Sequence, residues 1–118
     1  MAIKTPYINN VTLAGNIVRN PEVRQIGEKK TKVTTITVAN NRPYQDKDGN
    51  WQQETNFVDV EVWGKQAEKL GEYGKKGTPV IAEGNLKLNQ WEDKEGKSHS
   101  KLLIRADKIH ILNYPEKK

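Results

Sequence analysis

The sequence predicts an all-β domain, a five-stranded Greek-key barrel with one short helix between its third and fourth strands. Apolar and polar residues alternate through most of the chain, which is the period of a β-strand. Helical spacing of apolar residues occurs in one segment, residues 65–73. The length of 118 residues suits a single domain, which we expect to cover residues 1–113, with residues 114–118 as a short C-terminal end.

The first two strands are separated by a bend and a turn. The first strand covers residues 11–18 with its odd positions facing the core, and residues 22–26 continue it after the bend. A turn follows at residues 27–30, where glycine stands among charged residues. The second strand covers residues 32–40, which are rich in threonine, valine and isoleucine. The next fifteen residues, 41–55, are polar and predict a loop of a length that indicates function.

The helix divides the remaining strands. It places Ala67 and Leu70 on one face and ends at Gly74. The last strand is expected to break near Asp107. The remaining strands cover residues 56–63, 80–91 and 98–112. Three strands, a helix and two strands are the element order of the OB-fold, a small barrel that binds oligonucleotides on one face.

The third strand places large aromatic residues on a face that water reaches. Val58, Val60 and Val62 share one face, which we expect to be the core face. Alternation therefore puts Phe57 and Trp63 on the opposite face, together with the acidic residues Asp59 and Glu61. Exposed aromatic residues of this size indicate a binding partner. Packing of Phe57 and Trp63 against a second subunit stays open as an alternative.

The fourth strand repeats this arrangement. Lys87 and Trp91 face outward together, which suits a base stacked on the indole and a phosphate held beside it. Stacking contributes about 1–3 kcal/mol per base and is tolerant of sequence. The expected inward positions are Val80, Ala82, Gly84, Leu86 and Leu88.

The polar loop adds further candidates. Tyr44 lies close to Arg42, and Trp51 is either a stacking residue or folds back over its own loop. Each basic residue near the aromatic strands has a simpler interpretation as a solvated charge, but together they predict a positive groove for a nucleic-acid backbone. The candidate phosphate contacts are Arg42, Lys47, Lys65, Lys76 and Lys87.

Composition limits the other possibilities. The net charge of +5 favours a polyanionic partner. The chain has no cysteine, which excludes disulfides and thiolate metal sites and fits a reducing cytoplasm. No apolar run approaches the ~20 residues of a membrane span, and the N-terminus lacks a signal-peptide apolar region. We therefore expect a cytoplasmic protein without membrane contact and without a cofactor.

Catalytic and metal-binding interpretations have little support. Asp59-x-Glu61 lacks the acid-x-lysine spacing of common nuclease cores, and neither His99 nor His110 has an obvious nucleophile partner. The segment around Asp48-Gly49 is interpreted as a turn, because a calcium loop needs further ligands and a distal glutamate. We expect no catalytic residue and no metal site.

Short motifs in a fixed order span residues 11–112. They are Val11-Thr12-Leu13-Ala14-Gly15-Asn16, Asn20-Pro21-Glu22-Val23-Arg24, Trp63-Gly64-Lys65 with Ala67 and Glu68, Lys76-Gly77, Glu83-Gly84 and Trp91-x-Asp93-x-x-Gly96. Each motif is weak alone, but their order and spacing resemble the bacterial single-stranded DNA-binding proteins.

This resemblance implies an OB-fold subunit of a homotetramer that wraps single-stranded DNA in replication, recombination and repair, and hence a nucleoid-associated location. It implies base-stacking positions at Tyr44, Phe57, Trp63 and Trp91, three of which follow independently from strand alternation. Tyr44 and Phe57 stand where the family often has tryptophan, so stacking is expected to persist with less area.

The resemblance also has a departure. Family members typically end in a flexible linker and an acidic tip that recruits replication and repair proteins, whereas this chain ends at Pro115-Glu116-Lys117-Lys118. Partners recruited through such a tail are therefore not expected. Two further alternatives stay open: a primosome-type OB module that binds proteins, and a protein for single-stranded RNA, because stacking ignores the 2′-OH.

Overall fold

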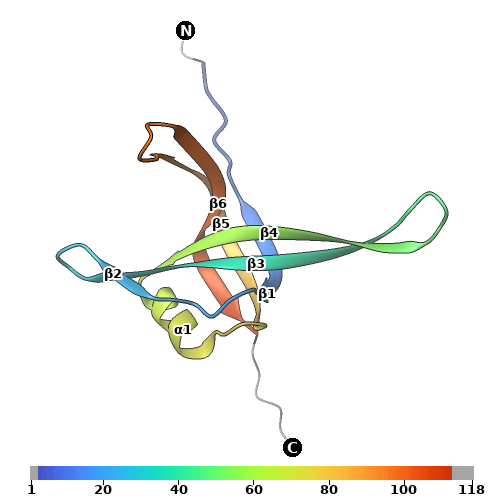
Figure 1. Cartoon of the computed structure of the whole chain (residues 1–118), viewed down its shortest axis with the longest axis horizontal. Helices are drawn as coiled ribbons and strands as arrows, with labels where there is room; N and C mark the ends of the chain where they lie inside the picture. The colour runs from blue at the N-terminus through green and yellow to red at the C-terminus, as the bar shows by residue number, and fades with distance from the viewer. Residues whose placement is uncertain (1–2, 113–118) are drawn as a thin grey trace, which may run out of the picture.

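Strand β1 closes the sheet into a barrel because both of its edges are hydrogen-bonded. In this computed structural model, which describes residues 3–112, β1 (Val11–Ile17) pairs antiparallel with β5 (Pro79–Glu92) and with β3 (Thr31–Gln45). The ring is completed in the order β5, β6 (Ser98–Ile111), β4 (Trp51–Trp63), β3 (Figure 1). The expected five-stranded barrel is confirmed.

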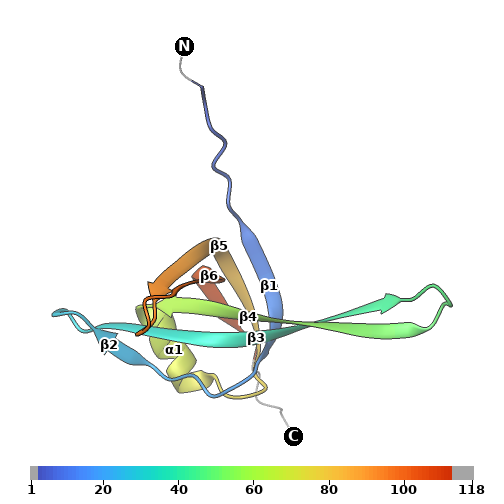
Figure 2. The same cartoon turned by 45° about the horizontal axis from the view of Figure 1, so that its top comes forward.

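Two smaller elements complete the fold. Helix α1 (Lys65–Tyr73) lies between β4 and β5, buries Ala67 and Leu70, and ends at Gly74, as expected. A three-residue strand, β2 (Arg24–Ile26), adds to the edge of β3 and forms a short extension outside the barrel (Figure 2). The proposed C-terminal end, residues 114–118, lies outside the described residues.

The prediction of a loop at residues 41–55 is wrong, because most of these residues belong to β3 and β4. β3 and β4 stay paired without interruption from Ala39↔Phe57 to Gln45↔Trp51, and residues 46–50 alone turn the chain. The Asp46 carboxylate fixes this turn by accepting the backbone N–H groups of Asp48 and Asn50, each at 2.9 Å. The ribbon projects from the barrel at the right of Figure 1. Its polar residues carry no apolar alternation because neither face of a projecting ribbon needs to be buried.

The β5–β6 hairpin also continues beyond the barrel, and here the inward assignment of two leucines is wrong. Leu86 and Leu88 are 45% and 51% exposed. The register changes between Glu83↔Lys108 and Gly84↔Ala106, so that Asp107 is an extra residue in β6. The expected break near Asp107 is therefore a β-bulge, which bends the hairpin. Beyond the bulge the two strands form a separate arm, and the side chains that continue the core face are exposed.

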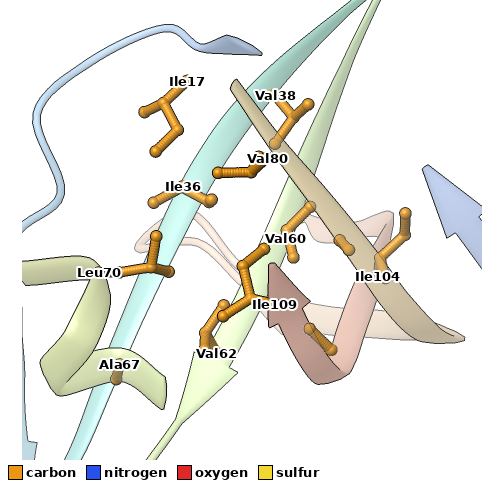
Figure 3. Packing of buried hydrophobic residues seen from close by; sticks show 12 residues of the cluster. Ile17, Ile36, Val38, Val60, Val62, Ala67, Leu70, Val80, Ile104 and Ile109 are labelled. Atoms are coloured by element: carbon orange, nitrogen blue, oxygen red, sulfur yellow. The ribbon is translucent and has the colours of Figure 1, made fainter. Parts of the chain in front are cut away.

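One apolar cluster fills the barrel and holds α1 against it. Side chains from every barrel strand point toward one another, and Leu70 of α1 packs among them (Figure 3). The buried members are Ile17, Ile36, Val38, Val60, Val62, Ala67, Leu70, Val80, Ala82, Ile104, Ala106 and Ile109. This core fixes which face of each strand remains outside.

Gly84→Ala is expected to destabilise the fold. Gly84 pairs with Val11 on one side and Ala106 on the other, and a Cβ at this position would clash with the Arg105 carbonyl oxygen and its backbone neighbours. Overpacking of this kind costs about 1–3 kcal/mol. Urea unfolding followed by circular dichroism measures the change. Gln90→Ala, on the exposed part of β5, is the control and should leave the midpoint unchanged; equal midpoints for both variants would contradict the close approach at Gly84.

Candidate nucleic-acid interface

The outer face of β4, β5 and β6 brings together the three aromatic residues that strand alternation predicts. On β4, the buried positions of Val60 and Val62 leave Phe57 and Trp63 on the outside. On β5, Trp91 is opposite His99 of β6. Two side-chain pairs connect the strands on this face: Lys101 Nζ lies 2.6 Å from Asp59 Oδ2, and Lys87 Nζ lies 3.3 Å from Glu61 Oε1.

The three aromatic residues differ in how much ring they present. Phe57 is 66% exposed and Trp91 is 46% exposed, whereas Trp63 is half-buried. The Trp63 indole Nε1–H donates a 2.7 Å hydrogen bond to Glu61 Oε1. This bond orients the Trp63 ring on the surface, while Phe57 and Trp91 offer larger free areas.

Both acidic residues on this face are paired with lysine. Asp59 Oδ1 also accepts a 2.8 Å hydrogen bond from the Thr37 hydroxyl. Partial burial works to raise the pKa of Asp59, but the hydrogen bonds from Lys101 and Thr37 and the charges of Lys101 and Arg19 outweigh it and lower that pKa. Within a single chain, both acids are thus satisfied by pairing with lysine. The negative charge predicted on this face is therefore locally balanced.

The ribbon aromatics lie apart from this arrangement. The unbroken register places Tyr44 in phase with Arg42 and the core-facing residues of β3, whereas Trp51 is in phase with Phe57. Tyr44 and Phe57 therefore start from opposite faces of the ribbon. Trp51 stands next to the turn and is 70% exposed, so it does not fold back over the turn.

The candidate phosphate contacts are spread over the molecule. Lys87 is the member that lies among the stacking residues. Arg42 forms an exposed pair with Glu54 on the ribbon, at 3.3 Å, and Lys47 is in the ribbon turn. Lys65 lines a groove beside α1, and Lys76 lies in the turn between α1 and β5. The structure therefore does not gather these five residues into one groove.

Sequence reasoning missed three residues on or next to this face. Lys101 pairs with Asp59, and His99 stacks on Trp91. The positive charge of Arg19 also lowers the pKa of Asp59. Counting outward from the Asp93–Lys97 turn places His99 opposite Trp91 and Lys101 opposite Asn89. The hairpin spacing in the sequence therefore carries the signal for His99 and Lys101.

The described part of the chain offers neither a membrane-spanning helix nor a metal cluster. Among residues 3–112, no helix is long and apolar enough to span a membrane. Within the same residues, no group of three or more histidine, aspartate or glutamate side chains is arranged to hold a metal ion.

Relatives of known sequence resemble this chain over most of its length. The "Single-stranded DNA-binding protein 2" of Chlorobaculum tepidum is 33% identical over 112 residues, which are 95% of this chain and 76% of that protein. The protein from Aquifex aeolicus is 36% identical, over 92% of this chain and 73% of its own length. The protein from Helicobacter hepaticus is 33% identical over 89% of this chain, which spans 61% of its length. Some relatives are thus considerably longer than this chain.

Solved structures share the fold. A structure described as a Plasmodium falciparum SSB complex with ssDNA matches with a TM-score of 0.83 at 18% identity, covering 94% of this chain and all of that one. A deletion mutant of the single-stranded DNA binding protein from Thermus aquaticus matches with a TM-score of 0.77 at 27% identity, covering 90% of this chain and 51% of that one. These likenesses confirm the OB-fold.

The family comparison agrees with the sequence relatives. The model of the single-strand binding protein family matches residues 8–112, which include the whole barrel, both projecting hairpins and every aromatic residue of the outer face. This chain belongs to the single-strand binding protein family.

Proposed function

We propose that this protein binds and protects single-stranded DNA, without regard to base sequence, during replication, recombination and repair, and that it is not an enzyme. The matching family is described as single-strand binding proteins, and the relatives are named as single-stranded DNA-binding proteins. The observation that carries the proposal is the outer face on which Phe57, Trp63 and Trp91 stand together with paired lysines. Bases of a single strand have free π-faces, whereas duplex bases are already stacked on one another, so this face favours single strands.

Stacking supplies most of the affinity in this proposal. Lys87 and Lys101 already have carboxylate partners, so a phosphate that contacts either lysine competes with Glu61 or Asp59. The gain from each such contact is smaller than the gain from an unpaired cation. Base stacking on the aromatic rings has no such competitor and is worth about 1–3 kcal/mol per base.

The ribbon extends the proposed binding surface. Trp51 offers an exposed indole near the turn, and Tyr44 with Arg42 offers a smaller ring beside a cation on the other ribbon face. We assign Tyr44 and Trp51 to further stacking and Arg42 and Lys47 to phosphate contacts along this ribbon. Lys65 and Lys76 would contact a strand that continues past the barrel toward α1.

We also propose a homotetramer of barrel domains, each covering residues 1–113, in the cytoplasm and associated with the nucleoid. One barrel presents a short stacking face, whereas several barrels can wrap a longer strand. Apolar surface that a single chain leaves uncovered supports association: Leu86, Leu88 and Leu102 are exposed on the side of the β5–β6 arm away from Trp91.

Trp91→Ala is expected to weaken binding to an oligo-dT by about 1–3 kcal/mol, because one stacking platform is lost. Unfolding should be unaffected, since Trp91 lies on the arm outside the core. Fluorescence anisotropy with labelled oligo-dT, oligo-rU and duplex DNA measures affinity and selectivity. Tyr73→Ala removes an exposed aromatic residue on α1 and is the matched control. Equal losses in the two variants, or equal wild-type affinity for duplex and single strand, would refute the stacking face.

The double variant Asp59→Asn with Glu61→Gln is expected to strengthen binding at low salt by about 0.5–2 kcal/mol in total, because Lys101 and Lys87 become free for phosphates. The amide oxygen that replaces the Glu61 carboxylate can still accept the Trp63 N–H. The gain should shrink as salt is raised. The control, Glu28→Gln with Glu72→Gln, changes the net charge equally away from this face. If the control gains as much affinity, net charge and not pairing explains the effect.

Sedimentation equilibrium should give a mass near 54 kDa, which is four chains of 13.5 kDa each. Leu88→Ser with Leu102→Ser should shift this equilibrium toward smaller species, because the exposed leucines lose apolar area. A wild-type monomer at micromolar concentration would contradict the tetramer but would leave DNA binding by one barrel possible.

A further inference from the structure

His99 covers one face of the Trp91 indole. The two rings are stacked, with centroids 5.4 Å apart and planes inclined by 19°. This offset geometry is favourable for an aromatic pair. Because Trp91 remains 46% exposed, an incoming base can stack on the indole face that His99 leaves free.

The turn of the β5–β6 arm holds the imidazole in place. His99 Nε2 lies 2.8 Å from Asp93 Oδ2, while Asp93 Oδ1 accepts the backbone N–H groups of Glu95 and Lys97, each at 2.9 Å. Asp93 is therefore fixed by the backbone of its own turn, and its second carboxylate oxygen holds the His99 ring in place. Turn, imidazole and indole form one connected unit at the end of the arm.

His99 also lies among charged groups of both signs. The charged groups around it are Asp93, Lys97 and Glu92 at the turn, Lys101 on its own strand, Lys87 on β5 and Asp59 on β4. The hydrogen bond from His99, followed by those from backbone N–H groups, lowers the pKa of Asp93. Carboxylates and lysines ordinarily keep their charge between pH 6 and 8, whereas histidine titrates in this range.

We propose that His99 is a positioning residue for base stacking on Trp91 and that its protonation makes DNA binding pH-dependent. This inference rests on the proposed function. Stacking of the imidazole fixes the orientation of the indole ring, and this effect does not depend on pH. When it is protonated, the imidazolium places a positive charge beside Trp91, where the phosphates of a stacked strand would pass. Affinity therefore increases as pH falls from 8 to 6.

Two substitutions separate the ring from its charge. His99→Phe keeps an aromatic ring for the stack but cannot take up a proton, and His99→Ala removes both. Wild-type affinity for oligo-dT should be about two- to fivefold higher at pH 6 than at pH 8. The slope of log affinity against log salt should steepen by about 0.7 at pH 6, the effect of one more neutralised phosphate. His99→Phe should bind like wild type at pH 8 without either pH effect. His99→Ala should bind about two- to tenfold more weakly at pH 8.

The second histidine of the chain provides the control. His110 pairs with Glu83 at 2.6 Å on the outside of the β1–β5–β6 sheet, so His110→Gln removes a histidine–carboxylate pair away from Trp91. This variant should keep both pH effects. The same pH dependence in His99→Phe as in wild type, or its loss in His110→Gln, would overturn the proposal. A wild type without pH dependence would overturn it as well, while DNA binding would stand. Unchanged affinity of Trp91→Ala would remove the stacking face and this inference together.

Discussion

Strict alternation along β4 is the constraint on which the rest of this structure depends. Val60 and Val62 are fully buried, and each of them forces its chain neighbours to the outside. A slip of one residue would expose the valines and bury Asp59 and Glu61, so the register of β4 is strongly specified. The same register presents Phe57 and Trp63 to the solvent. Core packing and the proposed DNA face are thus two consequences of one pairing, and a substitution that shifts the register would damage both.

The acidic residues on this face have a structural role that their charge alone does not suggest. β4 and β6 meet in parallel through just two registered pairs, Val60↔Ile104 and Glu61↔Arg105. Asp59 reaches Lys101 of β6 across this junction, and Glu61 reaches Lys87 of β5 beyond it. The lysine side chains of both pairs are exposed to solvent, and pairs of this kind contribute about 0–1 kcal/mol each, so their effect on stability is modest. The pairs connect the β5–β6 arm to β4 on the outer face, and Glu61 also orients the Trp63 ring.

Local sequence patterns predict most helices and strands well. Features that depend on contacts between distant strands could not be predicted from them. The helix at residues 65–73 and its end at Gly74 follow from apolar spacing and a glycine, both of which are local. The ribbon of residues 41–55 resembles a loop in sequence because strands that are polar on both faces show no alternation of apolar and polar residues. Leu86 and Leu88 are in phase with the core-facing residues of β5 but lie beyond the bulge at Asp107. The sequence of β5 alone does not indicate where the barrel ends. The partners of Asp59 and Glu61 depend on a parallel junction between segments distant in the chain, which sequence spacing does not reveal.

The two projecting hairpins explain how a small barrel can offer a large surface without losing stability. The buried cluster is confined to the barrel and α1, whereas Trp51, Trp91 and His99 lie on ladders that leave it. Residues on these arms can therefore change with little effect on the core. The arms differ in one respect: the β3–β4 ribbon continues in unbroken register, while the β5–β6 arm begins at a bulge. A bulge bends the hairpin locally. The direction of Trp91 is thus set by the bulge at Asp107, so the stacking face depends on a local feature of the β5–β6 hairpin that the core does not provide.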